Sequence, residues 1–282
     1  MEAGIVYSTW TFECREIAQA AARKGIALEL IREGELALSL GNGAHTETGF
    51  ILMRSLSHSR SIYEAMFFEK AGLVVINPSD AIRTCGDKGV CSLELSASGI
   101  RMPKTRIAFE PEQAKKAARE LGYPCVIKPV VGSWGRLVQR INDDDAAETA
   151  IGCREVLGSP MQKIYYLQEF VASRGRDIRI FVCGNEPVAA MYRYAQNGKF
   201  ACNIRAGGSA EPCEISDELV ELAAKVIGAV GEGVFGIDAI EGADGLCVLE
   251  VNPTPEFMGI QQTTHTKIAD KILEYAVKTA RE

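Results

Sequence analysis

Val234-Phe235-Gly236-Ile237-Asp238-Ala239 and, further along, Glu250-Val251-Asn252 are the two stretches that decide the fold of this chain. Both are typical of strands, and the short turn from Glu241 to Gly245 would fold them into a hairpin. Alternate side chains of a strand point to the same face, so Glu250 and Asn252 share a face that Asp238 completes from the neighbouring strand. Mg²⁺ prefers such hard oxygen ligands and is shared with nucleotide phosphates. The hairpin therefore predicts a protein that handles ATP.

The composition sets bounds on the function. The chain has 282 residues, 47% of them hydrophobic and 24% charged, and its net charge is −6. This acidic balance lacks the electrostatic footprint of nucleic-acid binding. No apolar run approaches a membrane span, and the first ten residues do not form a signal peptide. The nine cysteines are scattered without a CxxC pair, which favours buried free thiols over a zinc site. We expect a cytoplasmic protein that binds neither nucleic acid nor a membrane.

Strands and helices alternate through the first third of the chain, at residues 4–7, 11–24, 26–31, 49–53, 62–71 and 74–78. This βαβ pattern predicts an α/β layer with a parallel sheet for roughly residues 1–86. Further helices are expected at residues 87–97, 111–121, 144–156, 217–230 and 268–280. Further strands are expected at residues 124–129, 137–141, 165–170, 177–183 and 187–194.

Two lysines and a glycine loop suggest phosphate binding. Gly132-Ser133-Trp134-Gly135 lies between two expected strands, where glycines let backbone N–H groups approach a phosphate closely. Lys128 ends a buried apolar run, and Lys88 precedes a helix. Each feature alone has a plain structural explanation, as a hairpin turn or a surface lysine. Together with the oxygen cluster they favour phosphate binding.

Arginines gather around Asp177. Strand alternation places Asp177 and Arg179 on one face, and Arg193 and Arg205 follow. An exposed Arg–Asp pair is one explanation, and a cationic pocket for an acidic substrate and a migrating phosphoryl group is the other. A second polar group follows the third strand, where parallel α/β sheets bind ligands, and comprises Arg54, Ser57 and Arg60.

The order of these residues resembles that of the ATP-grasp ligases, and within them the RimK/LysX-type branch. The motifs that carry the resemblance are Thr84-Cys85-Gly86-Asp87-Lys88, Lys128-Pro129-Val130-Val131-Gly132-Ser133-Trp134-Gly135-Arg136-Leu137, Gly175-Arg176-Asp177-Ile178-Arg179 and Glu250-Val251-Asn252. The resemblance implies an α/β protein with an ATP-grasp fold preceded by an N-terminal α/β (pre-ATP-grasp) domain. The implied domains are residues 1–86, a central subdomain with the glycine loop at 87–165, and a C-terminal subdomain with the metal site at 166–282.

The resemblance also implies roles for the candidate residues. Lys88 and Lys128 would hold ATP phosphates beneath the loop Gly132, Ser133, Trp134, Gly135 and Arg136. Glu169, with the backbone of Phe170 and Val171, would hold the adenine, and Gln168, Asp177 and Arg179 complete the nucleotide site. One or two Mg²⁺ ions, with Mn²⁺ as a substitute, would bind Asp238, Glu250 and Asn252. The residues implied for catalysis at an acyl phosphate are Arg193, Asn203 and Arg205.

The implied reaction joins the amino group of glutamate or 2-aminoadipate to a glutamate-like carboxylate. In LysX-type enzymes the small acidic carrier protein LysW supplies that carboxylate, and Arg54, Ser57, Arg60, Glu256 and Phe257 are the candidate substrate residues. The expected LysX pattern Glu-Phe-Lys-Asn reads Glu256-Phe257-Met258-Gly259 here. Two alternatives therefore stay open, an α-L-glutamate ligase acting on a cofactor such as tetrahydromethanopterin and a RimK-like protein-modifying glutamate ligase. A non-enzymatic nucleotide-binding module fits less well because both lysines and both carboxylates are present, and homo-oligomers are the family habit.

Overall fold

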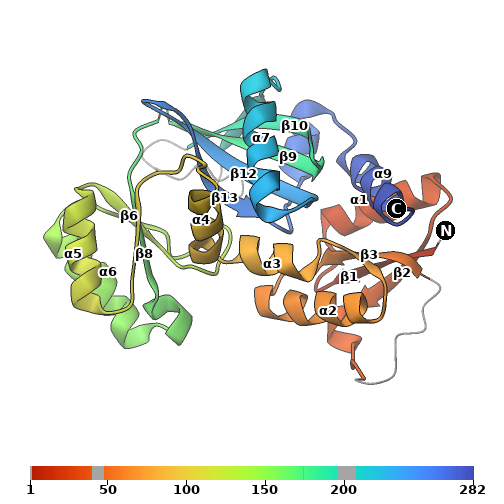
Figure 1. Cartoon of the computed structure of the whole chain (residues 1–282), viewed down its shortest axis with the longest axis horizontal. Coiled ribbons are helices and arrows are strands. Elements are labelled where there is room, and N and C mark those ends of the chain that lie inside the picture. The colour runs from red at the N-terminus through yellow and green to blue at the C-terminus, as the bar shows by residue number, and fades with distance from the viewer. Residues whose placement is uncertain (1, 40–47, 174, 196–207) are drawn as a thin grey trace.

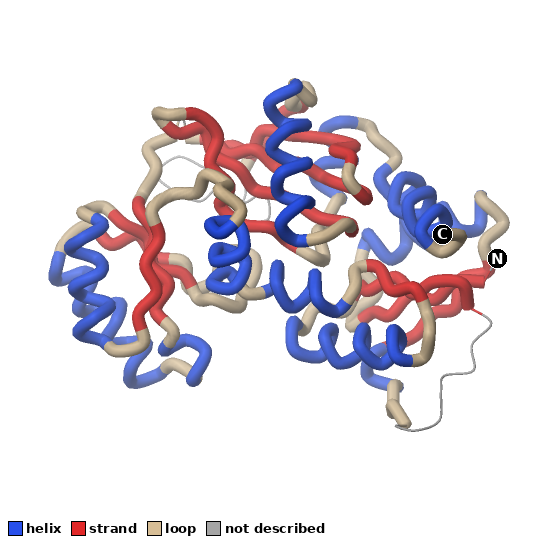
Figure 2. The backbone as a smooth tube through the Cα atoms, in the orientation of Figure 1, coloured by secondary structure: helices blue, strands red, loops and turns tan. Residues whose placement is uncertain are grey.

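The computed structural model describes residues 2–39, 48–173, 175–195 and 208–282. Three sheets lie side by side, each with helices against it (Figure 1, Figure 2). None of the helices in these residues is both long and apolar enough to span a membrane.

The N-terminal layer is a parallel sheet in the order β2-β1-β3-β4. Alternation sends Ile5 and Leu52 toward α1 and toward α9 (Ile268–Thr279), and Val6 and Ile51 toward α2. The parallel sheet expected for this part of the chain is confirmed. Its elements are β1 (Glu2–Tyr7), α1 (Phe12–Arg23), β2 (Ala27–Arg32), β3 (Thr48–Arg54), α2 (His58–Lys70), β4 (Val74–Ile76) and α3 (Ser79–Gly86), with a short 3₁₀ turn η1 at Glu33–Glu35.

The second sheet along the chain is antiparallel, in the order β5-β8-β6-β7, and packs against α5 and α6. The expected helix over residues 111–121 is found with those bounds, and Pro111 begins it because proline is tolerated in a first helical turn. The elements of this part are α4 (Lys88–Ala97), β5 (Thr105–Ala108), α5 (Pro111–Leu121), β6 (Cys125–Lys128), β7 (Gln139–Ile141), α6 (Asp144–Leu157), η2 (Pro160–Lys163) and β8 (Tyr165–Glu169).

The C-terminal sheet is antiparallel, in the order β11-β10-β9-β12-β13, with α7 across one face. The expected hairpin is present as β12 and β13, which pair from Gly236 opposite Asn252 to Gly242 opposite Gly245. The elements are β9 (Arg176–Gly184), β10 (Glu186–Tyr194), β11 (Ser209–Pro212), α7 (Asp217–Val230), β12 (Gly233–Gly242), β13 (Gly245–Asn252), α8 (Met258–Thr264) and α9 (Ile268–Thr279).

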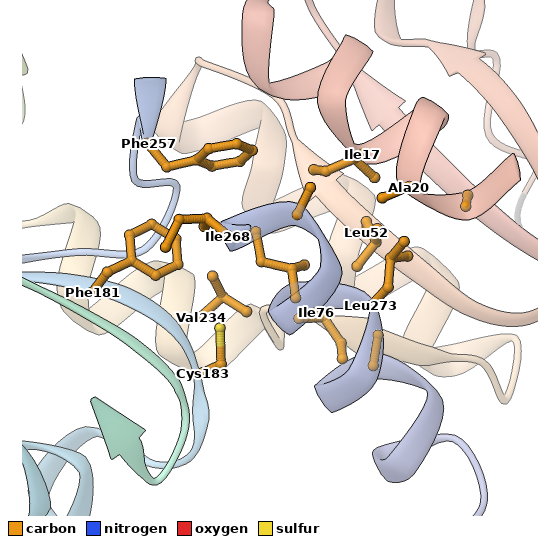
Figure 3. Packing of buried hydrophobic residues seen from close by; sticks show 14 of the residues in the cluster. Ile17, Ala20, Leu52, Ile76, Phe181, Cys183, Val234, Phe257, Ile268 and Leu273 are labelled. Atoms are coloured by element: carbon orange, nitrogen blue, oxygen red, sulfur yellow. The ribbon is translucent and has the colours of Figure 1, made fainter. Parts of the chain in front are cut away.

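One apolar cluster joins the first sheet to the third. Leu52 and Ile76 of the N-terminal layer meet Phe181, Phe257 and Leu273 of the C-terminal part, as Figure 3 shows. Phe257 is fully buried and makes edge-to-face contacts with Phe12 and Phe181. Because protein interiors are closely packed, this cluster fixes the segment after β13 against the N-terminal layer.

Candidate active site

A cavity of about 980 Å³ is lined from both antiparallel sheets, the glycine loop and the segment after β13. Its lining unites eighteen of the residues that the sequence proposed for the site. These are Lys88, Lys128, Gly132, Ser133, Trp134, Gly135, Arg136, Gln168, Glu169, Phe170, Val171, Asp177, Arg179, Arg193, Asp238, Glu250, Asn252 and Glu256.

The carboxylates and the carboxamide of the hairpin meet at one end of this cavity. Asp238 pairs with Glu250 across the two strands, and Nδ2 of Asn252 lies 3.3 Å from Oε1 of Glu250 and 3.5 Å from Oδ2 of Asp238. The three side chains therefore converge as the alternation of the strands predicted, with the carboxamide nitrogen of Asn252 facing both carboxylates. This donor set suits Mg²⁺, which accepts a few carboxylate and amide oxygens beside phosphate and water.

Glu250 is held in its charged form. Burial alone would raise its pKa, but the cations Lys88 and Lys128 outweigh burial and hold the pKa of Glu250 well below its usual range. Nζ of Lys88 lies 3.2 Å from Oε2 of Glu250. An ionised carboxylate is what a metal ligand requires, so this residue fits the predicted role.

The two lysines are fixed by different partners. Asp87 caps α4 by accepting from the backbone N–H groups of Gly89 and Val90, which places Lys88 in the first turn, where Nζ donates to the carbonyl of Gly132 at 2.8 Å. Nζ of Lys128 donates to Oε1 of Gln168 at 2.6 Å. Burial lowers the pKa of Lys128 to about 8. Gln168 is itself almost fully buried, so its contact positions the lysine.

The arginines form two cross-strand pairs. Arg193 lies opposite Asp177 and donates to both of its carboxylate oxygens, at 2.7 and 2.9 Å. Arg179 lies opposite Asp238 and donates through Nε and Nη2. Nη2 of Arg193 also reaches Oδ1 of Asp238 at 3.1 Å. The exposed Arg–Asp pair that is one explanation of the sequence is not found, because Asp177 is buried and pairs with Arg193 across the strands. Each oxygen of Asp238 is thus met by two donors, Oδ1 by Arg179 and Arg193 and Oδ2 by Arg179 and Asn252, so a metal ion bound there would replace one of these contacts.

The glycine loop is compact and partly left-handed. Trp134 and Leu137 have φ of 61° and 59°, and Gly135 has φ of 67°. Nε1 of Trp134 donates to Oε1 of Glu256 at 3.1 Å. Lys88 holds the beginning of the loop, and Nη2 of Arg154 holds its end by donating to the carbonyl of Leu137 at 2.6 Å.

The residues expected to hold adenine lie at the end of β8 and just after it. Oε1 of Glu169 accepts from the backbone N–H of Lys104 at 2.9 Å. The guanidinium of Arg140 stands over the Phe170 ring, 4.4 Å from its centroid. Glu169, Phe170 and Val171 all line the cavity at this strand end.

Other expected site residues are not part of this lining. Ser57 caps α2 through the backbone N–H of Arg60, and Arg60 is exposed and pairs with Glu33. Arg54 is buried and donates to the carbonyl of Pro255 at 3.1 Å. The expected substrate contact of Phe257 is corrected, because its ring is fully buried in the apolar cluster. Asn203 and Arg205 lie outside the described residues.

The structure adds cavity residues that the sequence did not single out. Arg140 comes from β7 and Gln262 from α8, whose first residues, Met258 and Gly259, also line the cavity. The signal for Arg140 was the alternation along β7, which places its side chain on the opposite face of the sheet from Gln139. Helix α8 spans seven residues, too few for a helical period to be recognised.

The cavity is lined by two antiparallel sheets, the glycine loop and the lysine–carboxylate cluster. This combination defines a nucleotide-dependent enzyme of the ATP-grasp class. A family model described as RimK-like ATP-grasp domain matches residues 85–276, and one described as LysX preATP-grasp domain matches residues 3–84. The chain belongs to the RimK-like ATP-grasp family. The predicted family, fold class and enzyme class, an ATP-dependent ligase, are confirmed. Ligases of this fold use ATP and a divalent metal ion.

The relatives share most of their length with this chain. An alpha-aminoadipate–LysW ligase LysX of Sulfurisphaera tokodaii is 33% identical over 274 residues, covering 96% of each chain. A glutamate–LysW ligase ArgX of the same organism is 33% identical and covers 92% of each. A tetrahydromethanopterin:alpha-L-glutamate ligase of Methanosarcina acetivorans is 35% identical, covering 73% of this chain and 71% of its own. The crystal structure of a RimK-domain ATP-grasp protein from Sphaerobacter thermophilus superposes with a TM-score of 0.79 at 22% identity, covering 98% and 100% of the two chains.

Proposed function

We propose that this protein joins the amino group of glutamate or 2-aminoadipate to a glutamate-like carboxylate that a LysW-type carrier protein supplies. The observation that carries the proposal is the convergence, in one cavity, of two lysines, two arginines and a carboxylate–amide cluster. Relatives named as LysW ligases over nearly the full chain support the choice of substrates.

The reaction has two steps. The substrate carboxylate oxygen attacks the γ-phosphorus of ATP, the bond to the β-phosphate oxygen breaks, and ADP leaves. The amine then attacks the acyl phosphate carbon, inorganic phosphate leaves, and the amine loses a proton to give the amide. No covalent enzyme intermediate is required, so catalysis rests on positioning and electrostatics.

The residues of the cavity have corresponding roles. Lys88 and Lys128 bind ATP phosphates, and the segment of residues 168–171 holds the adenine. One or two Mg²⁺ ions at Asp238, Glu250 and Asn252 would neutralise phosphate charge during transfer. Arg193 stabilises the acyl phosphate and the adduct that follows, a role shared in this proposal with Asn203 and Arg205.

A second candidate differs only in the acceptor. Met258 and Gly259 stand where the LysX pattern has lysine and asparagine, and both line the cavity. A neutral thioether and a glycine remove a positive charge that an acidic carrier would meet. This observation favours an α-L-glutamate ligase acting on a small cofactor, the activity that the Methanosarcina acetivorans relative's name states.

The domain boundaries, the cellular compartment and the oligomeric state are also part of the proposal. We place the domain boundaries after residues 86 and 165, where the sequence puts them. The eight described cysteines are all free thiols, seven of them buried, which suits the reducing cytoplasm. We also propose a homo-oligomer, following the habit of the family.

The test is an acceptor-dependent assay. Purified protein is given ATP, Mg²⁺ and glutamate or 2-aminoadipate, with either a LysW-type carrier or a pterin cofactor. ADP release is measured, and mass spectrometry follows the acceptor. The proposal requires that the carrier gain one residue of the added amino acid. Release of ADP only with the cofactor selects the second candidate, and no acceptor-dependent release refutes both.

Glu250→Gln tests the metal site in the same assay. The variant keeps the shape of the side chain but removes a charged metal ligand, so turnover should be lost. Glu221→Gln, on the exposed face of α7 and paired with Lys225, is the matched control and should keep the wild-type rate. A wild-type rate for Glu250→Gln would remove this residue from the metal site.

A further inference from the structure

The contact between Trp134 and Glu256 lies where two cavities meet. Both residues line the large cavity and a neighbouring one of about 160 Å³ that reaches toward α2, α3 and α4. The Arg136 guanidinium covers the indole, 4.7 Å from its ring centroid. The indole therefore separates the nucleotide side of the site from the side that faces the N-terminal layer.

The loop backbone needs a contact of this kind. Trp134 has φ of 61°, a left-handed conformation that a residue with a Cβ adopts rarely. Such conformations persist where surrounding contacts hold them. At Leu137, the other non-glycine residue of the loop with a left-handed φ, Arg154 donates to the carbonyl. At Trp134 the hydrogen bond from Nε1 to Oε1 of Glu256 holds the residue in this conformation.

Glu256 is a fixed acceptor, because buried charges hold the backbone on both sides of it. Arg54 donates to the carbonyl of Pro255 at 3.1 Å. Oε1 of Glu13 accepts from the backbone N–H groups of Phe257 and Met258, at 3.2 and 3.3 Å. Arg54 is 8% exposed and Glu13 is 3% exposed, and both belong to the N-terminal layer.

We infer that Glu256 is a positioning residue that holds the glycine loop closed through the Trp134 indole, so that the N-terminal layer determines where the loop closes. Glu256 then acts on the nucleotide through Trp134, in place of the substrate contact that the sequence predicts for it. The inference rests on the proposed function only in taking the loop to cover the ATP phosphates.

Tryptophan fluorescence tests the contact without turnover. The chain has two tryptophans, so Trp10→Phe leaves Trp134 as the only one, and acrylamide quenching of its emission is measured with and without ADP. In this background Glu256→Ala should raise the quenching constant about twofold or more, because the loop opens. Glu256→Gln keeps an amide oxygen as acceptor and should raise it less. Equal quenching in the Glu256→Ala variant and its parent overturns the inference, whether or not the protein proves to be a ligase.

Steady-state kinetics separates positioning from substrate binding. Trp134→Phe keeps a ring and removes the N–H donor, so the KM for ATP should rise about tenfold, equivalent to about 1.4 kcal/mol. Glu256→Gln should raise the KM for ATP less than this and leave that for the amino acid unchanged. Glu221→Ala on α7 is the surface control. If Glu256→Gln instead raises the KM for the amino acid and leaves quenching unchanged, Glu256 binds substrate directly and the inference is wrong.

Discussion

Replacing Asn77 by alanine removes a side chain that makes the hydrogen bonds to the β12 backbone that a neighbouring strand would otherwise make. β13 ends at Asn252, opposite Gly236, so Val234, two residues earlier on β12, has no strand partner on that side. Asn77 supplies both missing groups, since Nδ2 donates to the carbonyl of Val234 at 2.7 Å and Oδ1 accepts from its N–H at 2.5 Å. Nδ2 also donates to the carbonyl of Pro253 at 2.6 Å.

The magnitude follows from the burial of these groups. Asn77 is 2% exposed, so alanine leaves two carbonyls and one N–H unsatisfied, away from water. Each such group costs about 1–3 kcal/mol. Because local relaxation recovers part of this, we expect the free energy of unfolding to fall by about 3–5 kcal/mol. Activity should fall as well, since Pro253 directly follows the metal candidate Asn252.

Urea denaturation without nucleotide, followed by circular dichroism and by fluorescence, measures this change. The two probes should give one transition with an unchanged m-value. Asn185→Ala, in the exposed turn between β9 and β10, is the matched control and should stay within about 0.5 kcal/mol of wild type. A loss below about 1 kcal/mol for Asn77→Ala would refute the reasoning, because one ordinary hydrogen bond is worth that much.

Three further predictions concern Lys128 and the tight packing at Gly86. Lys128→Ala should weaken ATP binding by about 1.5–3 kcal/mol, the value of a hydrogen bond to a charged group, whereas calorimetry of Lys116→Ala, exposed on α5, should show no change. Since burial lowers the pKa of Lys128 to about 8, its charge is present below that pH and lost above it. ATP affinity of the wild type should therefore fall by about fivefold between pH 8 and pH 9, as the protonated fraction drops from about one half to about one tenth, and a fall of the same size in Lys128→Ala would assign it to another group. Gly86→Ala would place its Cβ 2.0 Å from Nδ1 of His58 and should lower the free energy of unfolding by about 1–3 kcal/mol, while Gly152→Ala, with open space on α6, should not destabilise.

Local pattern predicted the site wherever one strand or one turn carries the signal. Glu250 and Asn252 share a face by alternation alone, and Lys128 stands out as a lysine that ends an apolar strand. The residue opposite a given strand position depends on register, which a single segment does not contain. Asp177 is the example, because its partner, Arg193, is set by the pairing of β9 with β10.

The sequence by itself determined the chemistry of this protein, because an oxygen cluster, two lysines and a glycine loop are each encoded within a few residues. Tertiary structure alone decided which of the remaining polar residues line the cavity. Glu256 and Phe257 are neighbours in the chain, yet Glu256 meets Trp134 at the cavity and Phe257 is buried in the core. The physical reason is that packing against the N-terminal layer fixes the direction of each side chain in the segment after β13. Residues far away in the sequence, Arg54, Glu13 and Asn77, hold that segment in place.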